Sequence, residues 1–190
     1  MRHPKVLETL LQEVSSLVHQ IQMSSDGQSL NTSNFQPISL PYTTAVFYET
    51  LRLYPPVPFE LKQCQEATTL PDGTFLPNTS IVIWCIWAMN RSKLIWGDNA
   101  DDFKPERWLE NGIFVSKTAF EYPVFNGGPR TCLGKKMAEN VAVQVIASFV
   151  LGFQFKPIDD GERISKNSLT LPMEGGLPCR VSARNKITNN

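Results

Sequence analysis

The stretch FNGGPRTCLG, Phe125–Gly134, constrains this chain most, because it places one cysteine among glycines directly before an apolar helical pattern. Glycines permit left-handed backbone and close approach to a bound group, and Pro129 stiffens the loop. The pattern predicts Cys132 in the first turn of a helix that begins near Gly134, where free N–H groups and the helix dipole favour an anionic sulfur. In the alternative, Cys132 is only a small buried hydrophobic residue. This window alone leaves both interpretations open.

Length and composition favour one globular domain. The 190 residues, 42% of them hydrophobic, suffice for one core that buries about 70% of the unfolded surface. The 18 basic and 18 acidic residues cancel, which argues against nucleic acid as a partner. No stretch reaches the about 20 apolar residues of a membrane helix, and the N-terminus lacks the apolar run of a signal peptide. We expect an intracellular chain with no membrane span of its own.

The cysteines indicate neither a zinc site nor a disulfide framework. They stand at positions 64, 85, 132 and 179 without a CxxC pair, and the two histidines, His3 and His19, lie far from them in sequence. Such spacing favours a reducing compartment. One cysteine acting alone remains open.

Hydrophobic periodicity predicts a mainly α fold with small β-sheets. Apolar residues at helical spacing predict an amphipathic helix over Val6–Ile21, and a second helix is expected from after Ser39 to about Tyr54. Between them, residues 24–37 are expected to form a polar loop. The stretches Phe59–Ala67 and Ser80–Trp87 are typical of strands joined by a turn at Asp72 and Gly73.

In the second half of the chain, a segment without regular secondary structure is expected to precede a helix and short strands. Residues 90–112 mix turn signals with aromatics and are predicted to be pinned by Trp96, Phe103 and Trp108. A helix over Leu133–Leu151 is apolar nearly all round and is therefore expected to be buried. Short strands should follow between Phe153 and Arg184.

Glu49 and Arg52 are three residues apart on the second predicted helix and can form an ion pair there. Taken alone, such a pair is usually a solvated contact worth a few tenths of a kcal/mol. Spacing by itself therefore assigns it no special role.

Three motifs stand in a fixed order: ETLR from Glu49, FKPERW from Phe103, and the cysteine loop from Phe125. Together they resemble the cytochrome P450 family of haem-thiolate monooxygenases. The loop matches the family's Phe-x-x-Gly-x-Arg-x-Cys-x-Gly pattern at all five fixed positions. The intervening sequence, including RLYPPVP and WGDNADDFKPERW, also resembles the family, so the resemblance covers essentially residues 1–190.

The resemblance implies roles for single residues. Cys132 would be the axial thiolate ligand of the iron of haem b, in a loop that Gly134 completes, and sulfur donation would favour cleavage of the O–O bond. Phe125 would shield the sulfur side of the haem, and Arg130 would hold a propionate through charge-assisted hydrogen bonds. Lys62 stands where relatives carry an arginine or histidine for the propionates. It offers a point charge in place of a planar fork.

A buried network is implied as well. Glu49 and Arg52 would be joined by Arg107 of PERW to shape the core on the haem side, and removal of one partner from such a group costs about 3–5 kcal/mol. Lys135 and Lys136 would lie on the sulfur side, where they could dock an acidic, NADPH-fed flavoprotein reductase.

The motif order begins partway through the family's pattern. The resemblance therefore implies the C-terminal portion of a cytochrome P450 domain, without the family's central helix that delivers protons to bound oxygen, most of the substrate pocket or a membrane anchor. We expect a fragment that supplies no catalytic residue on the oxygen side. Full-length relatives would lie on the cytosolic face of the endoplasmic reticulum.

The resemblance implies insertion of one oxygen atom of O2 into a small lipophilic substrate. The segment VFNGGPRTCLGKKMA most resembles the branch that hydroxylates fatty acids and alkanes. Two alternatives remain: a truncated, non-catalytic fragment, and a thiolate-haem enzyme that rearranges peroxides. Relatives of the last kind often carry insertions in the cysteine loop, and this loop has none.

Overall fold

The computed structural model describes residues 3–24, 31–159, 161–166 and 168–184. Its longer helices are α1 (Pro4–Ser24), α2 (Pro41–Leu53) and α5 (Lys135–Gly152), with two single-turn helices, α3 (Ile86–Met89) and α4 (Lys93–Trp96). Short 3-10 turns lie at Thr32–Asn34, Pro105–Trp108, Pro123–Phe125 and Gly128–Arg130. The strands are β1 (Phe59–Gln63), β2 (Thr68–Thr69), β3 (Phe75–Leu76), β4 (Ile81–Cys85), β5 (Leu109–Glu110), β6 (Ile113–Phe114), β7 (Phe153–Pro157) and β8 (Cys179–Ala183).

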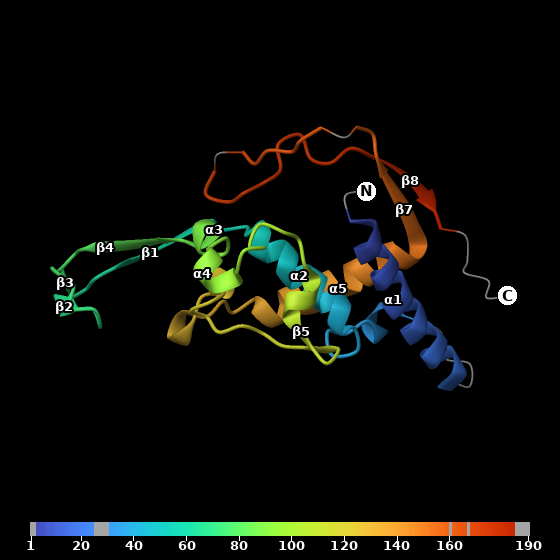
Figure 1. The fold of residues 1–190 in the computed structure, drawn as a ribbon, viewed down its shortest axis with the longest axis horizontal. Helices are drawn as coiled ribbons and strands as arrows, with labels where there is room; N and C mark the ends of the chain where they lie inside the picture. Colours follow the sequence, from blue (N-terminus) through green and yellow to red (C-terminus); the bar gives the residue numbers. More distant parts are fainter. Residues whose placement is uncertain (1–2, 25–30, 160, 167, 185–190) are drawn as a thin grey trace.

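The strands form antiparallel two-stranded ladders, β1 with β4, β2 with β3, β5 with β6 and β7 with β8. Figure 1 shows β1 and β4 as a ribbon that leaves the helical body, with β2 and β3 at its tip. The tip is the turn expected at Asp72, whose carboxylate accepts the Thr74 N–H at 2.9 Å, while Gly73 has a φ of +88°. The predicted mainly α fold with small sheets is confirmed.

Both N-terminal helix predictions are confirmed, and the packing explains their apolar faces. Val14 of α1, Leu40 and the α5 residues Val143 and Ala147 are buried together. A second cluster, around Trp108, contains five further buried residues: Ala45, Tyr48, Trp96, Ala100 and Tyr122. Trp96 and Trp108 pin residues 90–112 as expected, while Phe103 packs beside α1 and α2. Part of the loop predicted over 24–37 lies outside the described residues.

The expectation that the helix over 133–151 is buried is wrong. α5 buries only Val143 and Ala147 fully, whereas a stripe at i, i+4 spacing is 46–72% exposed and comprises Met137, Val141, Val145 and Phe149. α1 and α2 cover one side of α5, and the described elements leave the other side open. A pattern that is apolar all round does not reveal which side a neighbour covers.

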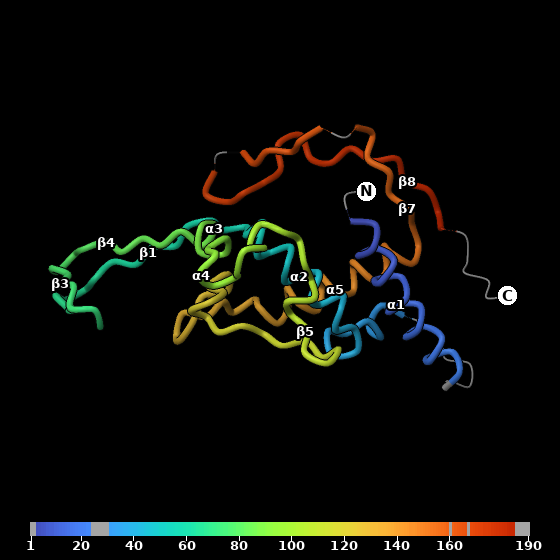
Figure 2. Tube along the Cα trace, viewed as in Figure 1, coloured from blue at the N-terminus to red at the C-terminus, as the bar shows by residue number. Residues whose placement is uncertain are grey.

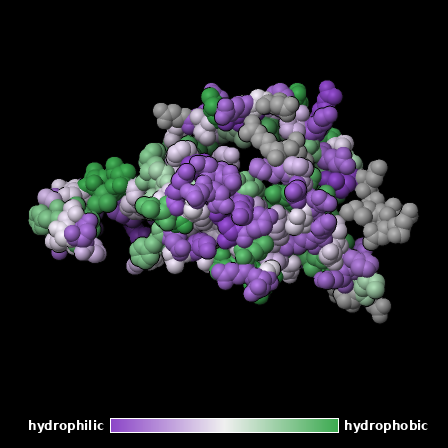
Figure 3. Space-filling model, viewed as in Figure 1, coloured by the Kyte–Doolittle hydropathy of each residue, from purple (hydrophilic) through white to green (hydrophobic). Residues whose placement is uncertain are grey.

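The β1–β4 ribbon also leaves apolar side chains uncovered. Leu61 and Ile83 are paired across the ladder and are 58% and 63% exposed. Figure 3 shows hydrophobic residues gathered along this ribbon, at the left of the view. The chain between β7 and β8 runs back over the body toward α3 (Figure 2), where the Leu171 N–H donates to the Pro56 carbonyl at 2.9 Å.

Candidate functional site

The cysteine loop, Phe125–Gly134, is closed on itself by backbone hydrogen bonds. The Cys132 N–H donates to the Phe125 carbonyl at 2.8 Å, and the Lys135 N–H donates to the Cys132 carbonyl at 3.2 Å. Cys132 is exposed, and it lies three residues before the first residue of α5. The prediction that Cys132 belongs to the first helical turn is therefore wrong, because the chain turns at Gly134 before the helix starts. Cys132 therefore lies outside α5, on its N-terminal side.

Two glycines of the loop are required by its geometry. Gly128 has a φ of +59°, which costs an L-residue energy and which glycine adopts freely. At Gly127 an added Cβ would lie 2.8 Å from the Cβ of Ala119, which is closer than real carbon atoms approach. Gly134 lies beside the sulfur, since a Cβ there would be 3.9 Å from Cys132 Sγ. The glycines thus bring the loop close to the preceding segment and leave the sulfur accessible.

Asn126 ties the cysteine loop to β1, a contact that the sequence analysis missed. Its φ of +58° together with a ψ of −171° is a conformation found almost only at glycine, so the backbone is strained at this residue. The side chain donates from Nδ2 to Glu60 Oε1 at 3.0 Å, and Glu60 Oε2 lies 3.7 Å from Lys62 Nζ. The run Asn-Gly-Gly is a turn signal that could have indicated the conformation of Asn126, but nothing local indicates Glu60 as its partner.

Lys62 and Arg130 are brought together at one hollow of about 490 Å³. Lys62 comes from β1, and Arg130 comes from the 3-10 turn Gly128–Arg130 of the cysteine loop. Lys62 Nζ also lies 5.6 Å from the centre of the Trp84 ring on the neighbouring strand. Two cations from segments far apart in sequence thus line the same hollow, and both can bind carboxylates.

Phe125 lies on the inner side of the loop. Its ring centre is 6.1 Å from that of Tyr48 and 6.5 Å from that of Tyr122, both buried in the Trp108 cluster. Lys135 Nζ lies 5.6 Å from the Phe125 ring centre and 4.0 Å from Glu139 Oε1. The loop therefore rests on the core through Phe125. Lys135 is held beside it, whereas Lys136 is exposed.

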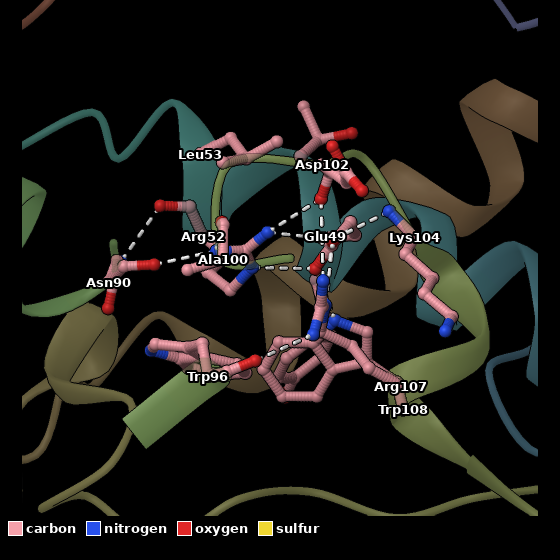
Figure 4. A network of polar contacts seen from close by, with 12 residues as sticks. Glu49, Arg52, Leu53, Asn90, Trp96, Ala100, Asp102, Lys104, Arg107 and Trp108 are labelled. Atoms are coloured by element: carbon pink, nitrogen blue, oxygen red, sulfur yellow. Dashed lines mark hydrogen bonds and ion pairs between the residues drawn. The ribbon is translucent and has the colours of Figure 1, made fainter. Parts of the chain in front are cut away.

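Glu49, Arg52 and Arg107 are brought into one network (Figure 4). Arg52 binds both carboxylate oxygens of Glu49, from Nε at 2.8 Å and from Nη2 at 2.9 Å. Its other N–H groups donate to three backbone carbonyls, those of Asn90, Ala100 and Asp102. The Arg107 Nε donates to Glu49 Oε1 at 3.0 Å. Glu49 and Arg52 are fully buried, so the interpretation of this pair as a solvated contact is excluded.

The Glu49 carboxylate is charged despite its burial. Burial alone would raise the pKa of Glu49, but hydrogen bonds from Arg52, the Lys104 N–H and the Trp108 indole outweigh it and hold the pKa below its usual value. Trp108 donates from Nε1 at 2.9 Å and Lys104 from its backbone at 2.7 Å. The network therefore fixes α2 to the segment around residues 90–108.

The described residues contain no group of three or more His, Cys, Asp or Glu side chains that could hold a metal ion. All four cysteines, each of which lies in the described ranges, are free. In the part of the chain that the structure covers, no helix is both long enough and apolar enough to cross a membrane. A single thiolate suits iron that a macrocycle already holds.

Comparisons with known proteins agree with the motifs. The family "Cytochrome P450" matches residues 1–179. Cytochrome P450 86B1 of Arabidopsis thaliana is 36% identical over 93% of this chain and 32% of its own length, and Cytochrome P450 CYP94D109 of Paris polyphylla is 37% identical over 98% and 37%. The crystal structure of a cytochrome P450 (CYP102L1) superposes with a TM-score of 0.76 at 25% identity, over 96% of this chain and 39% of that one. The chain thus spans about a third of the length of these relatives.

Proposed function

The chain belongs to the cytochrome P450 family, and on that basis we propose that it forms the haem-thiolate portion of a monooxygenase. Members of this family bind haem, whose iron is ligated by a cysteine thiolate. The reaction that we assign to the whole enzyme is insertion of one oxygen atom of O2 into a small lipophilic substrate. The chain supplies the sulfur side of that site, as the C-terminal portion of the domain.

The observation that carries this proposal is the position of Cys132. Its sulfur is accessible on a loop closed by the Cys132 N–H to Phe125 carbonyl bond of 2.8 Å. Beside the loop lies the hollow that Lys62 and Arg130 line. A soft anionic ligand next to two cations fits haem, which combines an iron atom with two carboxylates.

Haem held by a cysteine thiolate would supply oxygen activation here, because a thiolate donates electron density to the iron. The side chains of this chain then have separate roles. Cys132 would provide the anionic ligand, and Arg130 and Lys62 would bind the propionates, Arg130 with a planar fork and Lys62 with a point charge. Phe125 covers the sulfur side, and the bond between Asn126 and Glu60 fixes the distance between the loop and β1.

We assign the network of Glu49, Arg52 and Arg107 a positioning role. It joins α2 to the segment that carries Trp96 and Trp108, and Tyr48, on the same helix, packs against Phe125 of the loop. A shift of α2 would therefore move the surface on which the cysteine loop rests. None of the three network residues lines the hollow beside Lys62 and Arg130. We therefore assign the network an indirect effect, through the packing of Tyr48 against Phe125.

We assign Lys136 the main role in docking the electron donor, a flavoprotein with an acidic face, and Lys135 a smaller role. Lys136 is exposed and has no ion pair among the described residues. Lys135 is partly occupied by Glu139 and by the Phe125 ring. Lys136→Gln should slow reduction by a reductase at low salt more than Lys135→Gln does, whereas equal effects would contradict this division.

The substrate class that we assign is a fatty acid or alkane. The support is the sequence VFNGGPRTCLGKKMA, which covers the cysteine loop and the start of α5. This sequence resembles that branch of the family. Titration of the haem-loaded enzyme, extended to the length of its relatives, with a saturated fatty acid should shift its haem spectrum. An unchanged spectrum at saturating fatty acid would contradict the fatty acid assignment.

The haem assignment is tested by spectroscopy. The purified chain is loaded with haem, reduced and exposed to carbon monoxide, and the expected result is the absorption shift that is specific to thiolate ligation. Cys132→His should abolish that shift while haem still binds. Cys179→Ser removes a cysteine from β8, away from the loop, and should leave the shift unchanged. A shift that survives Cys132→His refutes the ligand assignment, and no shift in the unsubstituted chain indicates a non-catalytic fragment.

A further inference from the structure

One face of the β7–β8 hairpin carries only polar and cationic side chains. The ladder pairs Gln154 with Ser182 and Lys156 with Arg180. Because side chains alternate along a strand, these four point to the same side of the hairpin, and Arg184, two residues after Ser182, continues that side. The opposite side is aromatic: Phe153 and Phe155 pack against Phe149 of α5.

These five polar residues line a hollow of about 440 Å³, together with Leu7 of α1 and with Phe155 and Val181 of the two strands. Figure 1 shows the hairpin beside the N-terminal half of α1. No carboxylate lines this hollow in the described part of the chain. Within the same residues neither Lys156 nor Arg180 has an acidic partner within ion-pair distance, although Arg163, in the following loop, is paired with Asp159.

Arg184 is fixed in place by the backbone. Its Nε donates to the Val150 carbonyl at 2.9 Å, and Nη2 donates to the Phe153 carbonyl at 3.2 Å. These two bonds hold the guanidinium at the C-terminal end of α5, where free carbonyls favour a cation. The remaining N–H groups of Arg184 are thus available in a fixed orientation, which lowers the entropic cost of binding a ligand there.

The pairing of Lys156 with Arg180 is unfavourable unless an anion lies between them, because like charges opposite each other destabilise a ladder. We propose that this hollow, the β7–β8 basic site, binds the phosphate group of a phosphomonoester. Three cations together with the Gln154 amide and the Ser182 hydroxyl supply donors for three phosphate oxygens. The group could be carried by a soluble phosphomonoester or by a phosphatidic acid headgroup, and the two arms of the test separate these sources.

The first arm measures binding of inorganic phosphate to the purified chain by titration calorimetry at low salt. Lys156→Gln and Arg180→Gln should each weaken binding at least tenfold, and Lys156→Arg, which keeps the charge, should retain it. Arg163→Gln is the matched control, because it removes a cation that lies outside the hollow, and should leave the dissociation constant unchanged. Acetate, with fewer acceptor oxygens, should bind at least tenfold more weakly than phosphate. Circular dichroism verifies that each variant is folded.

Absence of phosphate binding, or equal binding by Lys156→Gln and the unsubstituted chain, would overturn the proposal. A thermal scan adds a readout that does not depend on calorimetry. Without phosphate, Lys156→Gln should melt at a higher temperature than the unsubstituted chain, because the like-charge pair is gone. Phosphate should reverse this order, and an unchanged order would count against the site.

The second arm uses vesicles of phosphatidylcholine with and without phosphatidic acid, sedimented with the chain. Binding to the phosphatidic acid vesicles that is lost in Lys156→Gln and kept in Arg163→Gln assigns the site to a lipid headgroup. Phosphate binding without such vesicle binding assigns it to a soluble phosphomonoester. Vesicle binding that Lys156→Gln and Arg163→Gln weaken equally reflects general charge and would contradict a built site.

Discussion

The carboxylate of Glu13, on α1, caps the start of α2 by accepting two hydrogen bonds from Thr43, 30 residues later in the chain. Oε2 accepts the Thr43 N–H at 2.8 Å and the Thr43 hydroxyl at 2.7 Å, while Oε1 accepts the Tyr42 N–H at 2.7 Å. The residue before α2 is Leu40, whose apolar side chain offers no acceptor. Glu13 therefore replaces a local cap with one from another helix, and its charge suits the positive end of α2.

Removal of this cap should destabilise the fold. We expect Glu13→Ala to lower the free energy of unfolding by about 2 kcal/mol, because two backbone donors at the start of α2 lose their partner. Glu13→Gln should lose less, since one amide oxygen still accepts. Urea unfolding measures both, and Glu8→Ala, at an exposed position of the same helix, is the control. Equal losses at Glu8 and Glu13 would mean that helix propensity, and not the cap, is the cause.

Replacement of Arg52 by lysine should be costly although the charge is kept. Arg52 uses all of its N–H groups, on Glu49 and on three carbonyls, and an ammonium cannot reproduce that planar arrangement. We expect Arg52→Lys to lower the free energy of unfolding by about 3 kcal/mol. Arg163→Lys, in the loop after β7, should change it by less than about 0.5 kcal/mol. A loss for Arg52→Lys as small as that of the control would show that charge alone holds the network.

The stability of the chain should fall in acid because of Glu49. Its pKa is lower in the folded protein than the usual value of about 4.3. The contribution of Glu49 to the free energy of unfolding is therefore complete above the usual pKa. It is lost as the pH falls through the pKa of Glu49 in the folded protein. Urea unfolding between about pH 3 and pH 7 should show a weaker pH dependence in Glu49→Gln. Asp72→Asn, at an exposed turn carboxylate that accepts the Thr74 N–H, should change that dependence less.

Substitution of Gly127 tests the close approach of the cysteine loop. Gly127→Ala places a Cβ 2.8 Å from the Cβ of Ala119 and should cost about 1–3 kcal/mol. Ala119→Gly in the same chain removes the clash and should restore most of the stability. Gly152→Ala, at the end of α5 where an added Cβ meets nothing within 4 Å, should be neutral or stabilising. Failure of Ala119→Gly to rescue Gly127→Ala would locate the strain elsewhere in the loop.

Patterns along the chain predict α1, α2, the turn at Asp72 and the motifs at Glu49 and Cys132, since each depends on residues within a few positions. The partners of Glu13 and Asn126 could not be predicted in this way. Glu13 falls on the polar side of its helix and resembles any solvated carboxylate, and its role depends on where α2 comes to lie. The open side of α5 was missed for the same reason, because burial is decided by neighbours and not by the helix itself.

The attachment of the cysteine loop has a consequence for the order in which the protein folds. Asn126 and Glu60 are 66 positions apart, and Tyr48, which supports Phe125, bonds to Glu139 across 91 positions. Contacts of such high sequence separation close late, after local helices have formed, because the entropy of a long loop must be lost first. We therefore expect the segment that carries Cys132 to assemble only after α2, β1 and α5 have met, so that its geometry depends on the tertiary fold as a whole.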